Sequence, residues 1–257
     1  SMIVSCVFTM YAQDGTIDLS FGSDGLVTFD IAQYGEYYED AVTDDEGNII
    51  IAGGAYAGDK LKPMIMRLSR EGILDTLFNN DGYKLYSLAG ASKDSKFNSV
   101  LLQADGKIVV GGYAGYTDGT YGVLFRINDD GTPDDAFGEN GVVKLFRSDN
   151  SYDTFIQKIL LQPDGKILYC GAEKSENTGH VSQFITGRCL ANGAPDSTFG
   201  GVGKVYCYFE GISSYATSLL LQSDGKIIAG GRTNGLFALI RYLANGVPDN
   251  TFGEWGE

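Results

Sequence analysis

The chain has 257 residues, and 43% of them are hydrophobic, which is ample material for a core. Its formal net charge of -14 excludes a nucleic-acid protein that relies on phosphate contacts, since those need clustered Lys and Arg. No stretch is long and apolar enough to span a membrane, which takes roughly 20 apolar residues.

Residues 1–12 precede the patterned part of the chain. Met2–Ala12 is apolar and ends in a small residue, which resembles the hydrophobic part and cleavage site of a secretory signal peptide without its positive leading end. The alternative is a genuine extra strand. We expect the signal-peptide remnant, because Met10 stands where every later repeat carries an arginine.

Residues 13–257 repeat one long loop five times. Its skeleton is Asp, Glu or Asn, then Gly-x-x-Asp-x-x-Phe, a Gly or Asn, and a Gly three positions later. The copies begin at Asp14, Glu71, Asp130, Asn192 and Asn245, and their phenylalanines are Phe21, Phe78, Phe137, Phe199 and Phe252. Such self-similarity is typical of repeat architectures. We expect one domain with repeats at about 14–70, 71–129, 130–191 and 192–244, and a partial copy at 245–257.

Each repeat predicts four short strands. The first follows the long loop, at Leu26–Asp30, Tyr83–Leu88, Val142–Phe146 and Lys204–Phe209. The second and third flank an Asp-Gly turn in LLQADGKIVVGG (101–112), LQPDGKILYCG (161–171) and LQSDGKIIAGG (221–231), with a degenerate copy at 44–54. Gly-Gly, with Cys170 as a substitute in one repeat, is expected to end the third strand. Without helical periodicity, these units predict an all-β fold, a β-propeller of four four-stranded blades of about 60 residues each.

The fourth strand of each repeat ends at an arginine, and an aspartate of the next long loop follows eight residues later. The pairs are Arg67 and Asp75, Arg126 and Asp134, Arg188 and Asp196, and Arg241 and Asp249. A constant offset within repeats of varying length indicates a fixed local geometry. An Arg–carboxylate ion pair that holds the loop is the natural explanation, although two separately constrained positions would give the same spacing.

These motifs resemble a known family. The combination of LQPDGKI, Gly-Gly, an apolar run with Arg, and DGTPDxxFGxxG is similar to the delta-60 repeat of secreted and surface proteins of bacteria, over about residues 13–256. The departures are EGN at 46–48, Asn79 in place of glycine, and Cys170. The resemblance implies a propeller-like array and an exported protein, and it implies no catalytic residues.

Five loop copies exceed the four that a closed four-bladed ring needs. We favour a closed four-bladed monomer with a loose tail. A homodimer that completes an eight-bladed ring, and a natural chain that continues beyond Glu257, are the alternatives.

Few residues suggest catalysis or metal binding. His180 is the one histidine and has no nucleophile elbow beside it, and the four cysteines show no metal-binding spacing. Cys170 and Cys189 could form a cross-strand disulfide, but we expect buried free thiols. The aspartates that recur in each repeat are expected to bond their own loops. We expect no cofactor or metal; calcium at Asp149–Asp153 is the one candidate, although this segment lacks the glycine and distal glutamate of a calcium loop.

Tyrosines concentrate in the segments that differ between repeats. If the repeating loops share one face of a propeller, these segments share the other. They hold Tyr34, Tyr37, Tyr38, Tyr56, Tyr113, Tyr116, Tyr121, Tyr152 and Tyr215. Tyrosine beside Asp, Asn and Ser is suited to stacking on sugars or anchoring protein partners, although such rings also pack between blades.

We therefore expect a secreted or surface-exposed module that binds a glycan or a protein and is not an enzyme. The alternatives are a carbohydrate-active enzyme that uses clustered carboxylates, and a structural spacer within a longer repeat protein.

Overall fold

The computed structural model describes residues 16–31, 35–145, 152–175, 182–209 and 213–253. Within these residues it contains fifteen strands in four antiparallel sheets, and no helix. Sheet 1 consists of β1 (Glu36–Thr43), β2 (Ile49–Ala57), β3 (Lys60–Leu68) and β4 (Tyr83–Leu85), and sheet 2 consists of β5 (Lys93–Leu102), β6 (Ile108–Gly115), β7 (Thr120–Ile127) and β8 (Val142–Leu145). Sheet 3 consists of β9 (Tyr152–Leu161), β10 (Ile167–Ser175), β11 (Ser182–Cys189) and β12 (Lys204–Cys207). Sheet 4 consists of β13 (Ser214–Leu221), β14 (Ile227–Thr233) and β15 (Leu236–Tyr242).

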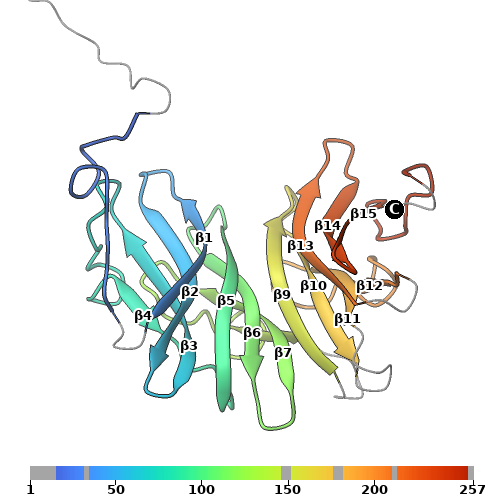
Figure 1. Ribbon diagram of the computed structural model, residues 1–257, viewed down its shortest axis with the longest axis horizontal. Helices are drawn as coiled ribbons and strands as arrows, with labels where there is room; N and C mark the ends of the chain where they lie inside the picture. Colours follow the sequence, from blue (N-terminus) through green and yellow to red (C-terminus); the bar gives the residue numbers. More distant parts are fainter. Residues whose placement is uncertain (1–15, 32–34, 146–151, 176–181, 210–212, 254–257) are drawn as a thin grey trace, which may run out of the picture.

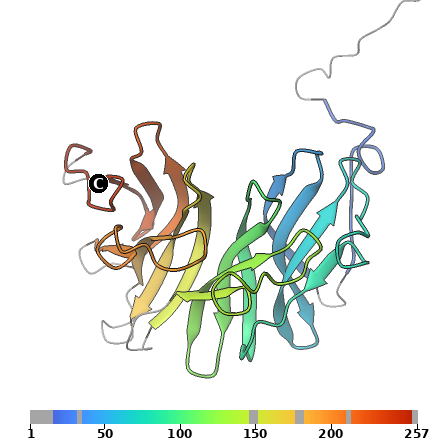
Figure 2. The same cartoon turned by 180° about the vertical axis from the view of Figure 1, so that it is seen from behind.

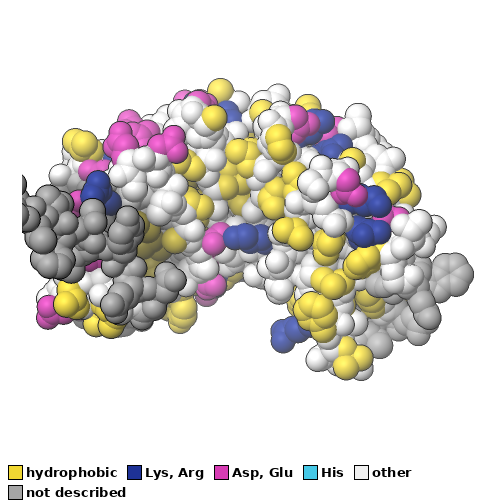
Figure 3. Space-filling view, turned by 90° about the horizontal axis from the view of Figure 1, so that it is seen from above, with side chains coloured by type: hydrophobic (Ala, Val, Ile, Leu, Met, Phe, Trp, Pro, Cys, Tyr) yellow, Lys and Arg dark blue, Asp and Glu magenta, His cyan; other side chains and the backbone are white. Residues whose placement is uncertain are grey.

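The all-β prediction is confirmed, but the described residues do not show all of the predicted four four-stranded blades. Sheets 1 to 3 have four strands and sheet 4 has three. The sheets follow one another along an open arc, with sheet 1 and sheet 4 at its two ends (Figures 1 and 2). The arc is hollowed on one side when seen from above (Figure 3). The expected closed ring is therefore not the structure that this chain adopts.

The strand after each long loop belongs to the sheet before the loop. β4 pairs with β3, β8 with β7 and β12 with β11, so each is the outermost strand of the preceding sheet. The loop turns the chain back beside the strand that it has just left, since Arg67 N–H bonds to Gly82 C=O and Asp75 N–H bonds to Arg67 C=O. Our grouping of this strand with the following repeat was wrong. The first of these predicted strands, Leu26–Asp30, forms only isolated bridges at Leu26.

The core lies between the sheets, in three clusters. Ile50, Ala52 and Ile65 of sheet 1 pack on sheet 2, and similar aliphatic side chains fill the space between sheets 2 and 3 and between sheets 3 and 4. The central strands β6, β7 and β11 of the interior sheets are therefore buried almost throughout, which explains why their sequences read as nearly continuous apolar runs.

The Gly-Gly pair lies inside the third strand of each repeat and does not end it, contrary to our expectation. The inner strand opposite carries a β-bulge, with its extra residue at Glu39, Asn98, Gln157 or Thr217. The bulge brings a backbone carbonyl against the second glycine of the pair. A Cβ on Gly112 would lie 2.1 Å from the carbonyl oxygen of Lys96. Only glycine fits there, whereas Ala52 and Cys170 occupy the first position of the pair.

The long loops stack on one another along the arc. The position occupied by Gly or Asn has a positive φ, 53° at Asn79 and 59° at Gly138, which Asn tolerates better than other residues with a side chain. Its N–H bonds to a carbonyl of the next loop, as from Asn79 to Asp130. The loop phenylalanine packs on the glycine of the next loop, as Phe78 does on Gly131. Each repeat is thereby joined to the following one.

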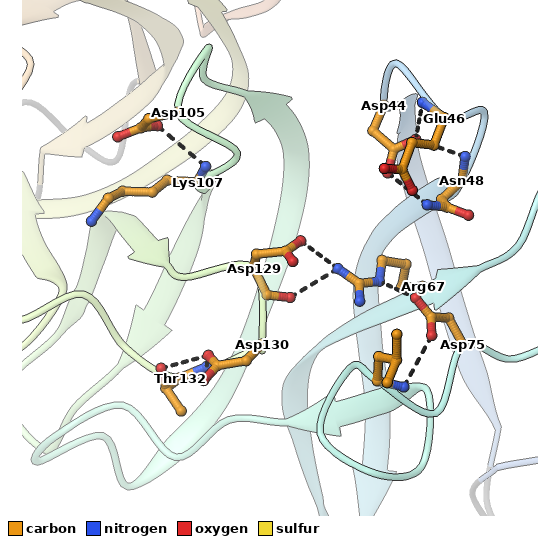
Figure 4. Close-up of polar contacts among 11 residues, drawn as sticks. Asp44, Glu46, Asn48, Arg67, Asp75, Asp105, Lys107, Asp129, Asp130 and Thr132 are labelled. Atoms are coloured by element: carbon orange, nitrogen blue, oxygen red, sulfur yellow. Dashed lines mark hydrogen bonds and ion pairs between the residues drawn. The ribbon is translucent and has the colours of Figure 1, made fainter.

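The predicted Arg–Asp ion pairs are present in all four repeats. The Nε–Oδ2 distances are 2.7 Å for Arg67–Asp75, Arg126–Asp134 and Arg188–Asp196, and 2.9 Å for Arg241–Asp249. Each guanidinium lies over the phenylalanine of its own loop. In the first three repeats it also donates to a backbone carbonyl of the next repeat, as Arg67 does to Asp129 (Figure 4). The arginine therefore stabilises its own loop and the contact between neighbouring repeats.

The lysine of the Asp-Gly-Lys turn is a third member of this group, which sequence inspection missed. Lys107 lies 2.8 Å from Asp134, and Lys226 lies 2.9 Å from Asp249. The first repeat has Asn48 at the equivalent position, where it bonds to Asp44 of its own turn.

The buried carboxylate of Asp196 makes stability depend on pH. Burial alone would raise its pKa, but bonds from Thr198 and the charge of Arg188 outweigh this effect and lower the pKa from 3.8 to about 2. Since the folded pKa lies below the unfolded one, the ionised group stabilises the fold above about pH 5 and loses this contribution as the pH falls from about 4 toward 2. We expect Asp196→Asn to be less stable than the wild type at about pH 6 and to approach it at about pH 2.5. Urea unfolding at both pH values tests this expectation, and a stability difference independent of pH would contradict it.

Candidate functional site

The segments that vary between repeats share one edge of the arc, the lower edge in Figure 1. They include the hairpin between β2 and β3, the hairpin between β6 and β7, and the connection from β4 to β5. The repeating turns and loops lie at the opposite edge. The repeating and the variable segments therefore lie at opposite edges, as the repeats predict. Most of the selected tyrosines lie on strand ends and not in loops.

Three of the selected tyrosines come together across sheets 1 and 2. The rings of Tyr37 and Tyr56 are in edge contact, with centroids 6.1 Å apart. The ammonium group of Lys96 lies 5.8 Å from the centroid of Tyr37 and forms an ion pair with Glu39. Tyr113 belongs to the same group, because it lies directly opposite Lys96 where β5 pairs with β6.

Phe155 extends this group toward sheet 3. Its ring is in edge contact with Tyr113, with centroids 5.2 Å apart. We call Tyr37, Tyr56, Lys96, Tyr113 and Phe155, with Glu39, the aromatic patch. Tyr37, Lys96 and Phe155 occupy equivalent positions on the inner strands β1, β5 and β9, two residues before the extra residue of each bulge. Aligning the repeats could have identified Lys96 and Phe155, which were not selected.

The phenols of Tyr56 and Tyr113 are neutral hydrogen-bonding groups near neutral pH, because the pKa of each is raised. Burial and the neighbouring carboxylates Asp94 and Glu39 raise the pKa of Tyr113. The neighbouring phenol of Tyr37 raises the pKa of Tyr56. Tyr37 is 47% exposed, so its ring offers an accessible apolar face with donors and acceptors around it.

The other selected tyrosines lie elsewhere. Tyr38 lies on β1 beside Tyr37 but lines a hollow on the opposite side of sheet 1. Tyr215 is half-buried on sheet 4, with the guanidinium of Arg232 5.3 Å from its centroid. Tyr34 and the side chain of Tyr152 lie outside the described residues.

Tyr116 and Tyr121 are buried and not part of an exposed surface. They are 6% and 8% exposed and pack edge to face, with centroids 5.1 Å apart. Tyr121 donates to Asp118, and Lys144 lies 4.2 Å from the centroid of Tyr116. Packing between sheets, which we considered as the alternative role for such rings, describes these two.

A polar network around Asp40 lies on the same inner strands as the aromatic patch. One carboxylate oxygen of Asp40 accepts bonds from Ser99 Oγ at 2.8 Å, Val100 N–H at 3.0 Å and Lys158 Nζ at 2.7 Å. These bonds join sheets 1, 2 and 3. Burial opposes ionisation of Asp40, but the bonds from Lys158, Ser99 and Val100 outweigh it and lower the pKa. Asp40, Ser99 and Lys158 follow the bulge at equivalent positions, which is the repeat signal that would have revealed them.

The remaining expectations concern thiols, metals and membranes. Cys170, Cys189 and Cys207 are buried free thiols, as predicted, and burial raises the pKa of Cys189 to about 12. His180, Cys6 and most of the calcium candidate at 149–153 lie outside the described residues. The part of the chain that the structure describes contains no group of three or more His, Cys, Asp or Glu arranged to hold a metal ion. The same part has no helix that could cross a membrane.

Comparison with known families identifies the class of domain. The sequence profile of a family described as a domain of unknown function (DUF5122) beta-propeller matches residues 103–137, 162–199 and 222–252. Each segment runs from the Asp-Gly turn to the phenylalanine of the long loop. The chain therefore carries propeller-type repeats. No curated protein matches the chain.

Solved structures of similar fold have low sequence identity to this chain. A protein of unknown function from Dyadobacter fermentans is 14% identical, with 85% of this chain and 69% of that chain covered and a TM-score of 0.54. A PL25 ulvan lyase is 13% identical, with 79% and 54% covered and a TM-score of 0.48. A fucose lectin from Kordia zhangzhouensis is 12% identical, with 66% and 97% covered and a TM-score of 0.38. At such identities the likeness to the Dyadobacter protein concerns the fold alone.

Proposed function

We propose that this chain is a non-catalytic binding module, exported to the bacterial surface or the medium, that recognises a glycan through the aromatic patch. The observation that carries the proposal is the convergence of Tyr37, Tyr56 and Tyr113 from two sheets around the Lys96–Glu39 ion pair. A sugar ring presents an apolar C–H face and a rim of hydroxyl groups. The exposed ring of Tyr37 would take the first, while Glu39, Lys96 and the phenols would bond to the second.

The repeated carboxylates support a binding role over catalysis. Asp75, Asp134, Asp196 and Asp249 are each held by an arginine, and three of them also by a lysine, so they serve to build the repeat. The patch instead combines aromatic rings with a lysine. Of the two carboxylates near it, Glu39 pairs with Lys96 and Asp94 accepts the N–H of Leu61, and this composition suits a binding surface.

Replacing the exposed ring of Tyr37 and the half-buried ring of Tyr56 tests the proposal. We expect the wild-type chain to bind at least one member of an immobilised panel of neutral and acidic polysaccharides. Tyr37→Ala/Tyr56→Ala should weaken that binding at least ~30-fold, about 2 kcal/mol, because aromatic anchors dominate such interfaces. Tyr83→Ala is the matched control, since Tyr83 starts β4 at the edge of the repeating loops.

Two results would contradict the proposal. One is the absence of binding across the panel by a folded wild-type chain. The other is equal loss in the Tyr83→Ala control, which would indicate a general effect of removing a tyrosine. Release of new chain ends from a bound polysaccharide would favour the enzyme alternative.

A further inference from the structure

Sheet 4 presents an apolar face at the end of the arc. Phe237 on β15 is 80% exposed and Leu220 on β13 is 56% exposed. With Ile228 and Leu239 they line an open hollow of about 570 Å³. Figure 3 shows hydrophobic side chains gathered at this end, on the right of the view. An exposed apolar face of this kind marks an interaction site in a soluble protein.

The equivalent side chains of the preceding sheets are buried by the next sheet. Phe184 on β11 corresponds to Phe237 and is 0% exposed, because it packs in one cluster with Ala216 of sheet 4. Leu101 on β5 corresponds to Leu220 and is 7% exposed, in the cluster with Ile156 and Ile159 of sheet 3. The free face of sheet 4 is therefore a sheet-packing surface that no other sheet of the described residues covers.

Sheet 1 presents the complementary face at the opposite end of the arc. Tyr38, Ile49, Ile51 and Leu68 line an open hollow of about 460 Å³. Their equivalents in sheet 3 are Ile156, Ile167, Tyr169 and Cys189, all of which lie in the cluster that covers sheet 2. The free face of sheet 1 is thus equivalent to the face with which sheet 3 packs on sheet 2.

A segment of the chain, residues 21–29, lies beside this face of sheet 1. Phe21, Val27 and Phe29 line the same hollow. The N–H of Gly22 bonds to the carbonyl of Glu71, which repeats the bond between successive loops elsewhere in the arc. Residues 26–29 therefore lie where the outer strand of a preceding sheet would be, whereas sheet 4 has three strands among the described residues.

We propose that sheet 4 of one copy of this chain docks on the free face of sheet 1 of a second copy, placing Phe237 against Tyr38 and residues 26–29 beside β15. The contact is head to tail, so two copies close a ring if the rotation allows it, and otherwise longer assemblies form. Loops 16–25 and 245–253 are copies of one element, and they cannot both fill the single position between the docked sheets. One of the two loops must therefore leave the position that it has in the free chain, and the free energy of this displacement weakens the association. This proposal is independent of glycan binding.

Light scattering behind a sizing column, over a range of protein concentrations, tests the association. We expect the mass to rise with concentration from 27.6 kDa to twice that value or more. Phe237→Glu should raise the dissociation constant at least ~10-fold, because it buries a charge in the contact. Val202→Glu is the matched control, on an exposed side chain of the loop before β12, and should associate like the wild type. A folded wild-type chain that stays monomeric throughout overturns the proposal.

Disulfide trapping tests the orientation of the contact. One chain carries Phe237→Cys and another carries Tyr38→Cys, both with Cys6→Ser, and the three buried thiols are left in place. We expect an oxidised dimer in the mixture of the two chains and little in either chain alone. A disulfide between two Phe237→Cys chains, with none between a Phe237→Cys chain and a Tyr38→Cys chain, would show that sheet 4 pairs with itself. That result would overturn the head-to-tail contact.

Discussion

Arg188→Ala should destabilise the chain by about 3–5 kcal/mol, the cost of removing one partner from a buried ion pair. Its guanidinium bonds to Asp196 at 2.7 Å, to Thr198 at 3.1 Å and to the carbonyl of Ala244 at 2.6 Å, and it lies over Phe199. The substitution leaves a buried carboxylate with Lys166 as its remaining cation, 3.6 Å away. Urea unfolding at neutral pH measures the effect.

Arg241→Ala is the matched control for this variant. Arg241 pairs with Asp249 in the same way, but among the described residues it bonds to no following repeat, and Lys226 lies 2.9 Å from the same carboxylate. We expect at most half the loss seen for Arg188→Ala. Equal losses would show that the contact between repeats contributes nothing to the role of this arginine.

Gly231→Ala should cost about 3 kcal/mol or more, at the upper end for overpacking, whereas Gly230→Ala next to it should be nearly neutral. A Cβ on Gly231 would lie 1.9 Å from the carbonyl oxygen of Tyr215, and a backbone atom held by the bulge cannot move aside. A Cβ on Gly230 meets only the end of the Leu239 side chain, at 3.0 Å. Alanine also favours the strand over glycine by about 0.5–1 kcal/mol.

Thermal unfolding of the two single variants distinguishes these effects. Both variants replace one glycine of the same strand, so any difference in conformational freedom of the unfolded chain cancels. If Gly230→Ala lost as much stability as Gly231→Ala, close approach of the bulge would not explain the second glycine.

The repeat motifs predicted the local geometry of the loops well. The eight-residue offset between Arg126 and Asp134 is enforced by a backbone bond between the same two residues, so the sequence spacing records a real turn. Asn79 replaces glycine without changing the loop, because both residues adopt a positive φ there. Such local features are visible in sequence since one short segment determines them.

The assignment of strands to sheets could not be derived in the same way. Tyr83–Leu85 pairs with the strand before its loop, and nothing in its own composition distinguishes this partner from the strand that follows. The open arc is likewise a property of how whole sheets pack.

Only some residues of the aromatic patch were predicted from the sequence, for a similar reason. Tyr37 and Tyr56 stood out by residue type, but Lys96 and Phe155 depend on a shared position in the repeat and not on composition. Tyr116 has the same residue type as Tyr37 yet is buried, because its ring packs with Tyr121. Residue type alone cannot separate an exposed ring from one that packs between sheets.

Titration calorimetry with the polysaccharide that binds best to the wild-type chain tests the central claim most directly. We predict that Tyr37→Ala/Tyr56→Ala binds that polysaccharide at least ~30-fold more weakly, with an unfolding temperature close to that of the wild type, while Tyr83→Ala binds normally. Unchanged affinity in the double variant would contradict the account and would place the binding surface elsewhere on the molecule.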